Sequence, residues 1–249
     1  MNANNSNKRD TIDKLRQEIL HMQGFKPGGT GTTKMPGLEV IEQAFPNAIF
    51  PLGAVHEFIC EGQEGSAASG GFIGGLLGLL MQETGACLWI STSRKLFPPA
   101  LESFGAAPHR VIFADVDKEK DLLWATEEAL KCEGLSAVIT ELRDITFAQS
   151  RRLQLAVEKS RVTSFIMRKD PARLSSTTSV ARWKILPAPS VNEAGLPGVG
   201  FPHWQVELLK VRNGYPGCWE VTWSAGKFET QQKRSGALTI PLDGQRKTG

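Results

Sequence analysis

Apolar and polar stretches alternate along this 249-residue chain in a way that predicts a parallel β-sheet with helices between its strands. Short, mostly apolar runs are typical of buried strands, and segments with helical apolar stripes separate them. The predicted strands are Val55–Cys60, Ala86–Thr92, Arg110–Val116, Leu135–Leu142 and Val162–Arg168. The predicted helices are Phe72–Glu83, Pro98–Gly105, Lys118–Glu133 and Thr146–Ser160. This order is typical of an α/β fold whose sheet is covered on both faces.

The pattern changes after the fifth predicted strand. Ala181–Pro187, His203–Arg212 and Gly217–Ser224 are strand-like runs that follow one another without a helix between them. The dipeptide Asn213-Gly214 separates the last two runs and favours a tight turn. The predicted fold class is therefore α/β, with a mostly parallel twisted sheet flanked by helices and a C-terminal antiparallel hairpin.

Three regions follow from the composition along the chain. Residues 35–229 are expected to form one core, because 41% hydrophobic residues suit a single sizeable domain. Residues 1–34 are expected to hold an amphipathic helix, ending near Met22, and a Gly-rich flexible linker. The apolar stripe of that helix needs a covering surface, either on its own domain or on another protein. Residues 230–249 are polar and basic, which predicts a flexible tail.

Overall composition excludes few classes of function. A net charge of +3 is too small to predict nucleic-acid binding. The four cysteines are widely spaced, and Cys60 and Cys87 lie in apolar runs, which favours free buried thiols over disulfides or zinc ligands. We expect a cytoplasmic protein without a membrane partner, since the sequence shows neither a signal-peptide core nor an apolar run of membrane length.

The stretch from Val55 to Glu83 has the layout of a phosphate-binding loop, namely a strand, a Gly/Ser turn and a helix. The pattern G-x-x-x-x-G-K-[ST], laid from Gly62, ends on the hydroxyl of Ser69. Ala67 stands in place of the second glycine and Ala68 in place of the lysine. The aligned residues are Gly62, Gln63, Glu64, Gly65, Ser66, Ala67, Ala68 and Ser69. They form either a degenerate nucleotide site or a plain strand-to-helix connector, and the missing lysine favours the connector.

The order of these elements resembles the core of the RecA-like recombinases and ATPases over roughly residues 38–228. Val206–Trp223 is similar to the late strand-turn-strand of that superfamily. Within it, the phrase GAVHEFICEGQEGSAASGGF, residues 53–72, resembles the ImuA family most closely. The specific feature is the segment His56-Glu57-Phe58 leading into a loop that lacks lysine. His56 itself is expected to be a partly buried histidine with satisfied hydrogen bonds and no catalytic role.

The resemblance implies that the catalytic positions of a RecA-like ATPase are mostly lost. Ala68 replaces the phosphate-gripping lysine, Ser93 stands at the catalytic glutamate, and Arg168 stands at the sensing glutamine. Each lost charged hydrogen bond costs about 1.5–3 kcal/mol, and phosphoryl transfer depends on positioning and charge. We therefore predict a pseudo-ATPase without a cofactor, and weak ATP binding by the loop amides stays open.

Ser69, which would ligate magnesium in a RecA-like ATPase, is retained. Glu141 stands where that superfamily places an acidic residue beside the metal. It is either a remnant of the metal site or a strand-end carboxylate paired with Arg143 or Arg168, and the ion pair is favoured.

Four basic residues are candidates for an interface or for anion contact. Lys210 and Arg212 match a pair that, in the resembled family, reaches a neighbour's nucleotide across a filament. Arg151 and Arg152 lie on a basic helix that faces DNA, a partner or solvent. DNA binding is left uncertain, because both intervals that correspond to the RecA DNA loops are short.

The resemblance implies a non-catalytic adaptor of error-prone translesion synthesis in the SOS response to DNA damage. The implied partner is an ImuB-like homologue of Y-family polymerases, with RecA and an error-prone replicative-type polymerase as further candidates. The N-terminal helix, the hairpin and the basic tail Lys233–Lys247 are the expected contact elements. Two alternatives remain: an active DNA-dependent ATPase that borrows Lys210 from a neighbour, and a cell-division inhibitor of the SulA type.

Overall fold

A computed structural model describes residues 15, 35–81, 85–191 and 200–232. The predicted N-terminal helix and linker lie outside these residues, apart from Leu15. The predicted tail also lies outside them from residue 233 onward. Among the described residues, no helix is long and apolar enough to cross a membrane.

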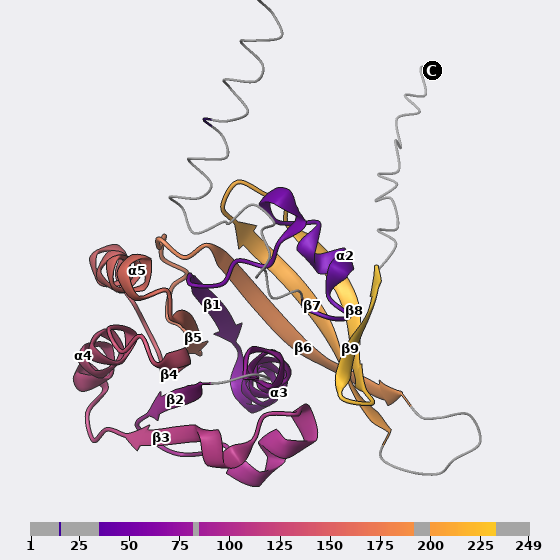
Figure 1. The fold of residues 1–249 in the computed structure, drawn as a ribbon, viewed down its shortest axis with the longest axis horizontal. Helices are drawn as coiled ribbons and strands as arrows, with labels where there is room; N and C mark the ends of the chain where they lie inside the picture. Colours follow the sequence, from indigo (N-terminus) through magenta and orange to yellow (C-terminus); the bar gives the residue numbers. More distant parts are fainter. Residues whose placement is uncertain (1–14, 16–34, 82–84, 192–199, 233–249) are drawn as a thin grey trace, which may run out of the picture.

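One mixed sheet organises the described part of the chain (Figure 1), with the order β3-β2-β4-β5-β1-β6-β7-β8-β9. The first six strands pair in parallel, and the last three continue the sheet in antiparallel register. The parallel strands are β1 (Val55–Cys60), β2 (Ala86–Ser91), β3 (Val111–Asp115), β4 (Leu135–Leu142), β5 (Thr163–Lys169) and β6 (Ala181–Val191). The antiparallel strands are β7 (Phe201–Val211), β8 (Gly217–Ser224) and β9 (Lys227–Gln232). This arrangement confirms the predicted fold class and is consistent with a RecA-like core.

Helices cover both faces of the parallel part of the sheet and create two apolar cores. Helix α3 packs against β1, β5 and β6 on one face, while α4 and α5 pack side by side on the other. A capping box, in which Thr146 and Gln149 exchange hydrogen bonds, starts α5. The helices are α2 (Glu39–Glu42), α3 (Gly62–Leu80), α4 (Glu119–Leu130) and α5 (Phe147–Ser160), with 3₁₀ turns η1 (Pro46–Ala48), η2 (Pro98–Phe104) and η3 (Pro108–Arg110).

The C-terminal part is larger than the predicted hairpin. Strand β6 runs parallel to β1 and antiparallel to β7, so it joins the two halves of the sheet. Strand β9 was not predicted, because its sequence KFETQQ has a single large apolar residue, Phe228. That ring is buried, with its centroid 5.1 Å from Phe72 of α3 and 4.8 Å from Trp223 of β8. Contacts with distant residues therefore stabilise a strand that the local pattern does not indicate.

His56, Cys60 and Cys87 all lie in the interior of the protein. His56 is fully buried; its Nε2 hydrogen-bonds the carbonyl of Pro51 at 2.7 Å, and its Nδ1 accepts the indole N–H of Trp183 at 3.2 Å. Burial lowers the pKa of His56 to about 4. Cys60 and Cys87 are free and buried, as predicted, and burial raises their pKa values to about 11 and about 12.

Candidate functional site

The segment that resembles a phosphate loop is helical. Helix α3 begins at Gly62, one residue after Glu61 and two after the end of β1, so Gly62–Ser69 forms its first two turns. Gly62 alone in this segment has a positive φ, of 66°. The expected Gly/Ser turn over Gly62–Gly71 is therefore wrong. The residues that replace the glycine and the lysine, Ala67 and Ala68, belong to the best helix-forming type, so the helix extends back to the strand.

The residues aligned with the phosphate loop consequently divide between the two sides of a helix. Gly62, Glu64 and Ala67 are exposed, whereas Gly65, Ala68 and Ser69 are buried against the sheet. Ser66 is half-buried, and its hydroxyl donates to the carbonyl of Gly62 at 2.8 Å. Ser69, expected to ligate magnesium, lies fully buried in the interior instead.

A carboxylate of the chain itself occupies the N-terminus of α3. The amide of Gly62 donates to Oδ1 of Asp170 at 2.7 Å. Asp170 follows β5 directly in a left-handed conformation with a φ of 43°, and its amide donates to the carbonyl of Cys60 at 2.9 Å. A helix N-terminus favours an anion because its amides and dipole carry partial positive charge. The position that favours a phosphate thus holds an internal anion.

The neighbouring charges are also paired within the chain. Both carboxylate oxygens of Glu141 have partners in the chain: Oε1 accepts the indole N–H of Trp89 at 2.8 Å, and Oε2 pairs with Lys169. The favoured ion pair of Glu141 is present, but its predicted partners were wrong. Arg143 contacts Glu119 through its backbone amide, and Arg168 turns toward other carboxylates. The adjacent Lys184 pairs with Glu61 at 2.8 Å.

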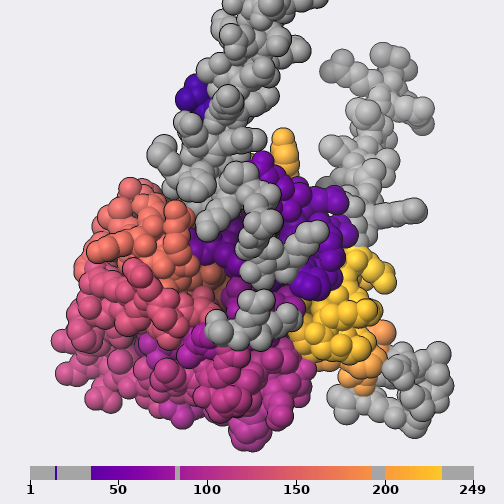
Figure 2. All heavy atoms as spheres, viewed as in Figure 1, coloured from indigo at the N-terminus to yellow at the C-terminus, as the bar shows by residue number. Residues whose placement is uncertain are grey.

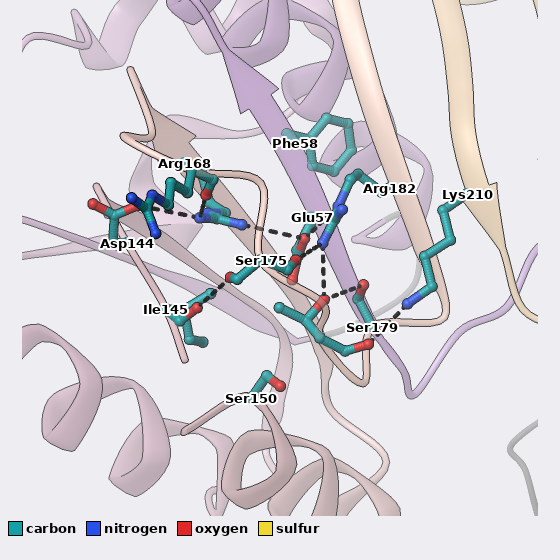
Figure 3. A network of polar contacts seen from close by, with 12 residues as sticks. Glu57, Phe58, Asp144, Ile145, Ser150, Arg168, Ser175, Ser179, Arg182 and Lys210 are labelled. Carbon is teal, nitrogen blue, oxygen red and sulfur yellow. Dashed lines mark hydrogen bonds and ion pairs between the residues drawn. The ribbon is translucent and has the colours of Figure 1, made fainter. Parts of the chain in front are cut away.

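Beneath this region lies a buried charge cluster formed by β1, β5 and β6 (Figure 3). Glu57 is 1% exposed, and Arg182 donates from Nε to its Oε2 at 2.8 Å. Arg168, also fully buried, places Nη1 3.9 Å from the same oxygen. Its Nη2 reaches Asp144 at 3.2 Å, at the surface end of the cluster. Two guanidinium groups thus share one buried carboxylate. Removing the carboxylate or a guanidinium group would leave an uncompensated charge in the interior and lower the stability of the fold.

Basic side chains also fix the connection between β5 and β6, the interval that the sequence resemblance aligns with the second RecA DNA loop. Each donates to a carbonyl of that connection: Arg168 to Arg173 at 2.8 Å, Arg182 to Ser175 at 2.7 Å, Lys210 to Thr177 at 2.8 Å, and Arg212 to Thr178. Burial lowers the pKa values of Lys210 and Arg212. Lys210 and Arg212, predicted as interface residues, therefore contact their own chain.

Arg151 and Arg152 are exposed on α5, and their ion pairs are also internal. Arg152 lies 2.5 Å from Glu127 of α4, and Arg151 lies 3.8 Å from Glu158 of its own helix. Among the described ranges of the chain, no group of three or more His, Cys, Asp and Glu residues is arranged to hold a metal ion.

Comparison with known proteins places the chain in a family. Two curated relatives, both named Protein ImuA, come from Caulobacter vibrioides strains NA1000 / CB15N and ATCC 19089 / CIP 103742 / CB 15. Each is 34% identical over 191 residues, which is 72% of this chain and 78% of the relative. This chain belongs to the ImuA family. No protein-family model matches it.

The crystal structure of SulA from Pseudomonas aeruginosa is similar to part of this ImuA-family chain. It covers 46% of the chain and 97% of SulA, with a TM-score of 0.40 and 19% identity. A likeness of that size bears on neither partner nor function. Membership in the ImuA family instead supports the coarse functional expectation, an accessory role in translesion synthesis after DNA damage.

Several residues of this site were missed by the sequence analysis of the ImuA-family chain. Asp170, Lys169 and Arg182 all carry contacts that define it. A signal was present, because a charged residue inside an apolar strand, such as Glu57 in VHEFIC, needs a partner of opposite charge. The partner could not be chosen, since Arg182 is 125 residues away.

Proposed function

We propose that this ImuA-family chain is a non-catalytic adaptor of error-prone translesion synthesis. It acts by binding an ImuB-like homologue of Y-family polymerases, with RecA and an error-prone replicative-type polymerase as further partners. The observation that carries the non-catalytic part is the Asp170 carboxylate on the first amide of α3. An internal carboxylate at this position repels a phosphate and uses the donor that would bind it.

The surrounding residues support the absence of ATP hydrolysis. Ala68, at the lysine position, is 6% exposed and packs into the core, so no cation extends from this turn of α3. Glu141, at the metal-binding position, has both carboxylate oxygens engaged by Trp89 and Lys169. Phosphoryl transfer depends on charged groups that are positioned around the phosphates. At these two positions, Ala68 has no charge and Glu141 is paired within its own chain.

The alternative of an ATPase that borrows Lys210 from a neighbour requires that lysine to leave its own chain. Lys210 donates to the carbonyl of Thr177 at 2.8 Å, and the cationic group lies close to Arg182. Reaching a neighbour's nucleotide would break this hydrogen bond and release the connection between β5 and β6. The intrachain contact thus favours the adaptor.

Phosphate release tests the catalytic part. The purified chain is incubated with ATP and magnesium, with and without single-stranded DNA, and a working RecA-type ATPase serves as the positive control. We expect no turnover above the rate without protein. DNA-stimulated phosphate release that disappears in Lys210→Ala would establish the ATPase and remove the adaptor.

Co-purification with the ImuB homologue tests the binding part. We expect a complex of the two full-length proteins that survives gel filtration in the presence and in the absence of ATP. If both proteins are folded, as judged by circular dichroism, and they elute separately across a range of salt concentrations, the proposed partner is wrong.

A further inference from the structure

Helices α4 and α5 expose large apolar side chains along the line where they meet. The chain has six tryptophans, and five of them are buried, whereas Trp124 on α4 is 65% exposed. Leu155 on α5 is 50% exposed. In the space-filling view the two helices lie next to each other on the left of the molecule (Figure 2). An exposed tryptophan is a common energetic centre of protein interfaces, so this face is a candidate contact surface.

Two hollows follow the line between the helices. One, of about 240 Å³, is lined by Trp124 and Leu123, and the other, of about 380 Å³, by Leu155 and Ala156. The ion pair between Glu127 and Arg152 borders both hollows. Together they form a groove, called here the α4–α5 groove, with an apolar position on each side of a polar bridge.

The rim of the α4–α5 groove has more positive than negative charges. Its cationic residues are Lys120, Lys131, Arg152 and Lys159, and its carboxylates are Glu127 and Glu133. Arg152 pairs with Glu127, and Lys131 pairs with Glu128 beside the groove. The positive excess therefore comes from Lys120 and Lys159 against Glu133. The ends of the chain do not complement this charge. Residues 1–34 have six Lys and Arg against three Asp and Glu, and residues 233–249 have four against one. The groove therefore suits an acidic segment from another protein.

We propose that the α4–α5 groove binds an acidic amphipathic segment of a partner protein. A large apolar side chain of that segment packs beside Trp124, and its carboxylates pair with the cationic rim. The inference rests on the proposed function for the identity of the partner, the ImuB homologue. It assigns the contact to a surface that Arg151 and Arg152 of α5 alone did not indicate.

An array of overlapping 20-residue peptides that spans the ImuB homologue provides the probe. Binding of the full-length chain to each peptide is measured at about 0.15 M and 0.5 M salt. Two groove variants, Trp124→Ala and Lys159→Glu, are compared with matched controls at exposed positions elsewhere, Phe97→Ala and Lys95→Glu. Circular dichroism verifies that all four variants are folded.

We expect the bound peptides to combine acidic residues with a large apolar residue. Trp124→Ala should weaken their binding roughly 30-fold, the effect of losing one interface hot spot. Lys159→Glu should weaken it severalfold at low salt and less at high salt, because salt screens exposed charges. Phe97→Ala and Lys95→Glu should bind as the unmodified chain does.

The inference is overturned if no peptide binds, or if bound peptides are insensitive to both groove variants. Full-length ImuB separates this failure from that of the proposed function. A full-length complex that tolerates Trp124→Ala and Lys159→Glu removes the groove and keeps the adaptor. The absence of any full-length complex removes the adaptor and, with it, the groove's proposed partner.

Discussion

Glu57→Gln removes a buried negative charge while it preserves the volume of the side chain. In the native chain, Glu57 Oε2 lies 2.8 Å from Arg182 Nε and 3.9 Å from Arg168 Nη1. All three side chains are buried, Arg168 completely. The substitution leaves two guanidinium groups beside a neutral amide, with Asp144 at the surface end as the remaining carboxylate.

The size of the effect follows from the burial of the cluster. Breaking a buried ion pair by removing one partner costs about 3–5 kcal/mol, because an uncompensated charge remains in the interior. The amide oxygen of glutamine still accepts a hydrogen bond from Arg182, which recovers about 1 kcal/mol. We therefore expect Glu57→Gln to lower the free energy of unfolding by about 2–4 kcal/mol. For a chain of this length, that corresponds to a fall in Tm of roughly 4–16 °C.

Urea unfolding followed by tryptophan fluorescence measures this loss, since five of the six tryptophans are buried. Asp144→Asn is the matched control: it removes a carboxylate that contacts the same Arg168, at 3.2 Å, but is 48% exposed. A surface ion pair contributes at most about 1 kcal/mol, so the control should stay close to the unmodified chain. If Glu57→Gln costs no more than Asp144→Asn, the two buried guanidinium groups do not depend on Glu57 and the reasoning is refuted.

Three further predictions concern pH, helix phase and helix packing. Burial lowers the pKa of His56 to about 4 in the folded chain, against the ordinary 6.5. Its contribution to stability is therefore full above pH 6.5 and falls by about 3 kcal/mol as the pH drops to 4. Urea unfolding across this range should show a steeper loss of the free energy of unfolding in the unmodified chain than in His56→Gln. Ala68→Lys should destabilise the chain strongly, because Ala68 is buried. Ala67→Lys should change its stability by less than about 0.5 kcal/mol, because Ala67 is exposed. Equal losses of Tm in the two variants would contradict a helical Gly62–Ser69. Gly78→Ala should destabilise by about 1–3 kcal/mol, since its Cβ would lie 2.4 Å from the carbonyl oxygen of Phe104. Gly70→Ala should stabilise by about 0.5–1 kcal/mol, since its Cβ would meet no atom within 4 Å beyond the neighbouring backbone of its own helix. Urea titrations of both variants should show opposite signs, and a shared sign would count against this packing.

The sequence predicted most of the sheet because buried parallel strands have a strong local signature. The apolar runs that became β1 and β4 have the predicted bounds, Val55–Cys60 and Leu135–Leu142. Strand β9 has no such signature, since Phe228 is its one large apolar residue and its stabilising contacts come from α3 and β8. The roles predicted for Lys210 and Arg212 across an interface stay predictions. In the folded chain, both side chains contact the β5–β6 connection of their own chain.

The sequence by itself determined the alternation of strands and helices, the loss of the phosphate-binding lysine and the resemblance to the ImuA family, because these depend on residue type and spacing. Tertiary structure decided what the altered segment became. Gly62–Ser69 is locally compatible with a turn or a helix, and the carboxylate at its first amide comes from Asp170, 108 residues away. The pairing of Glu57 with Arg182 likewise joins residues that are brought together by adjacent strands. Charge partners are chosen by proximity in the folded sheet, and the spacing of residues along the chain does not contain that information.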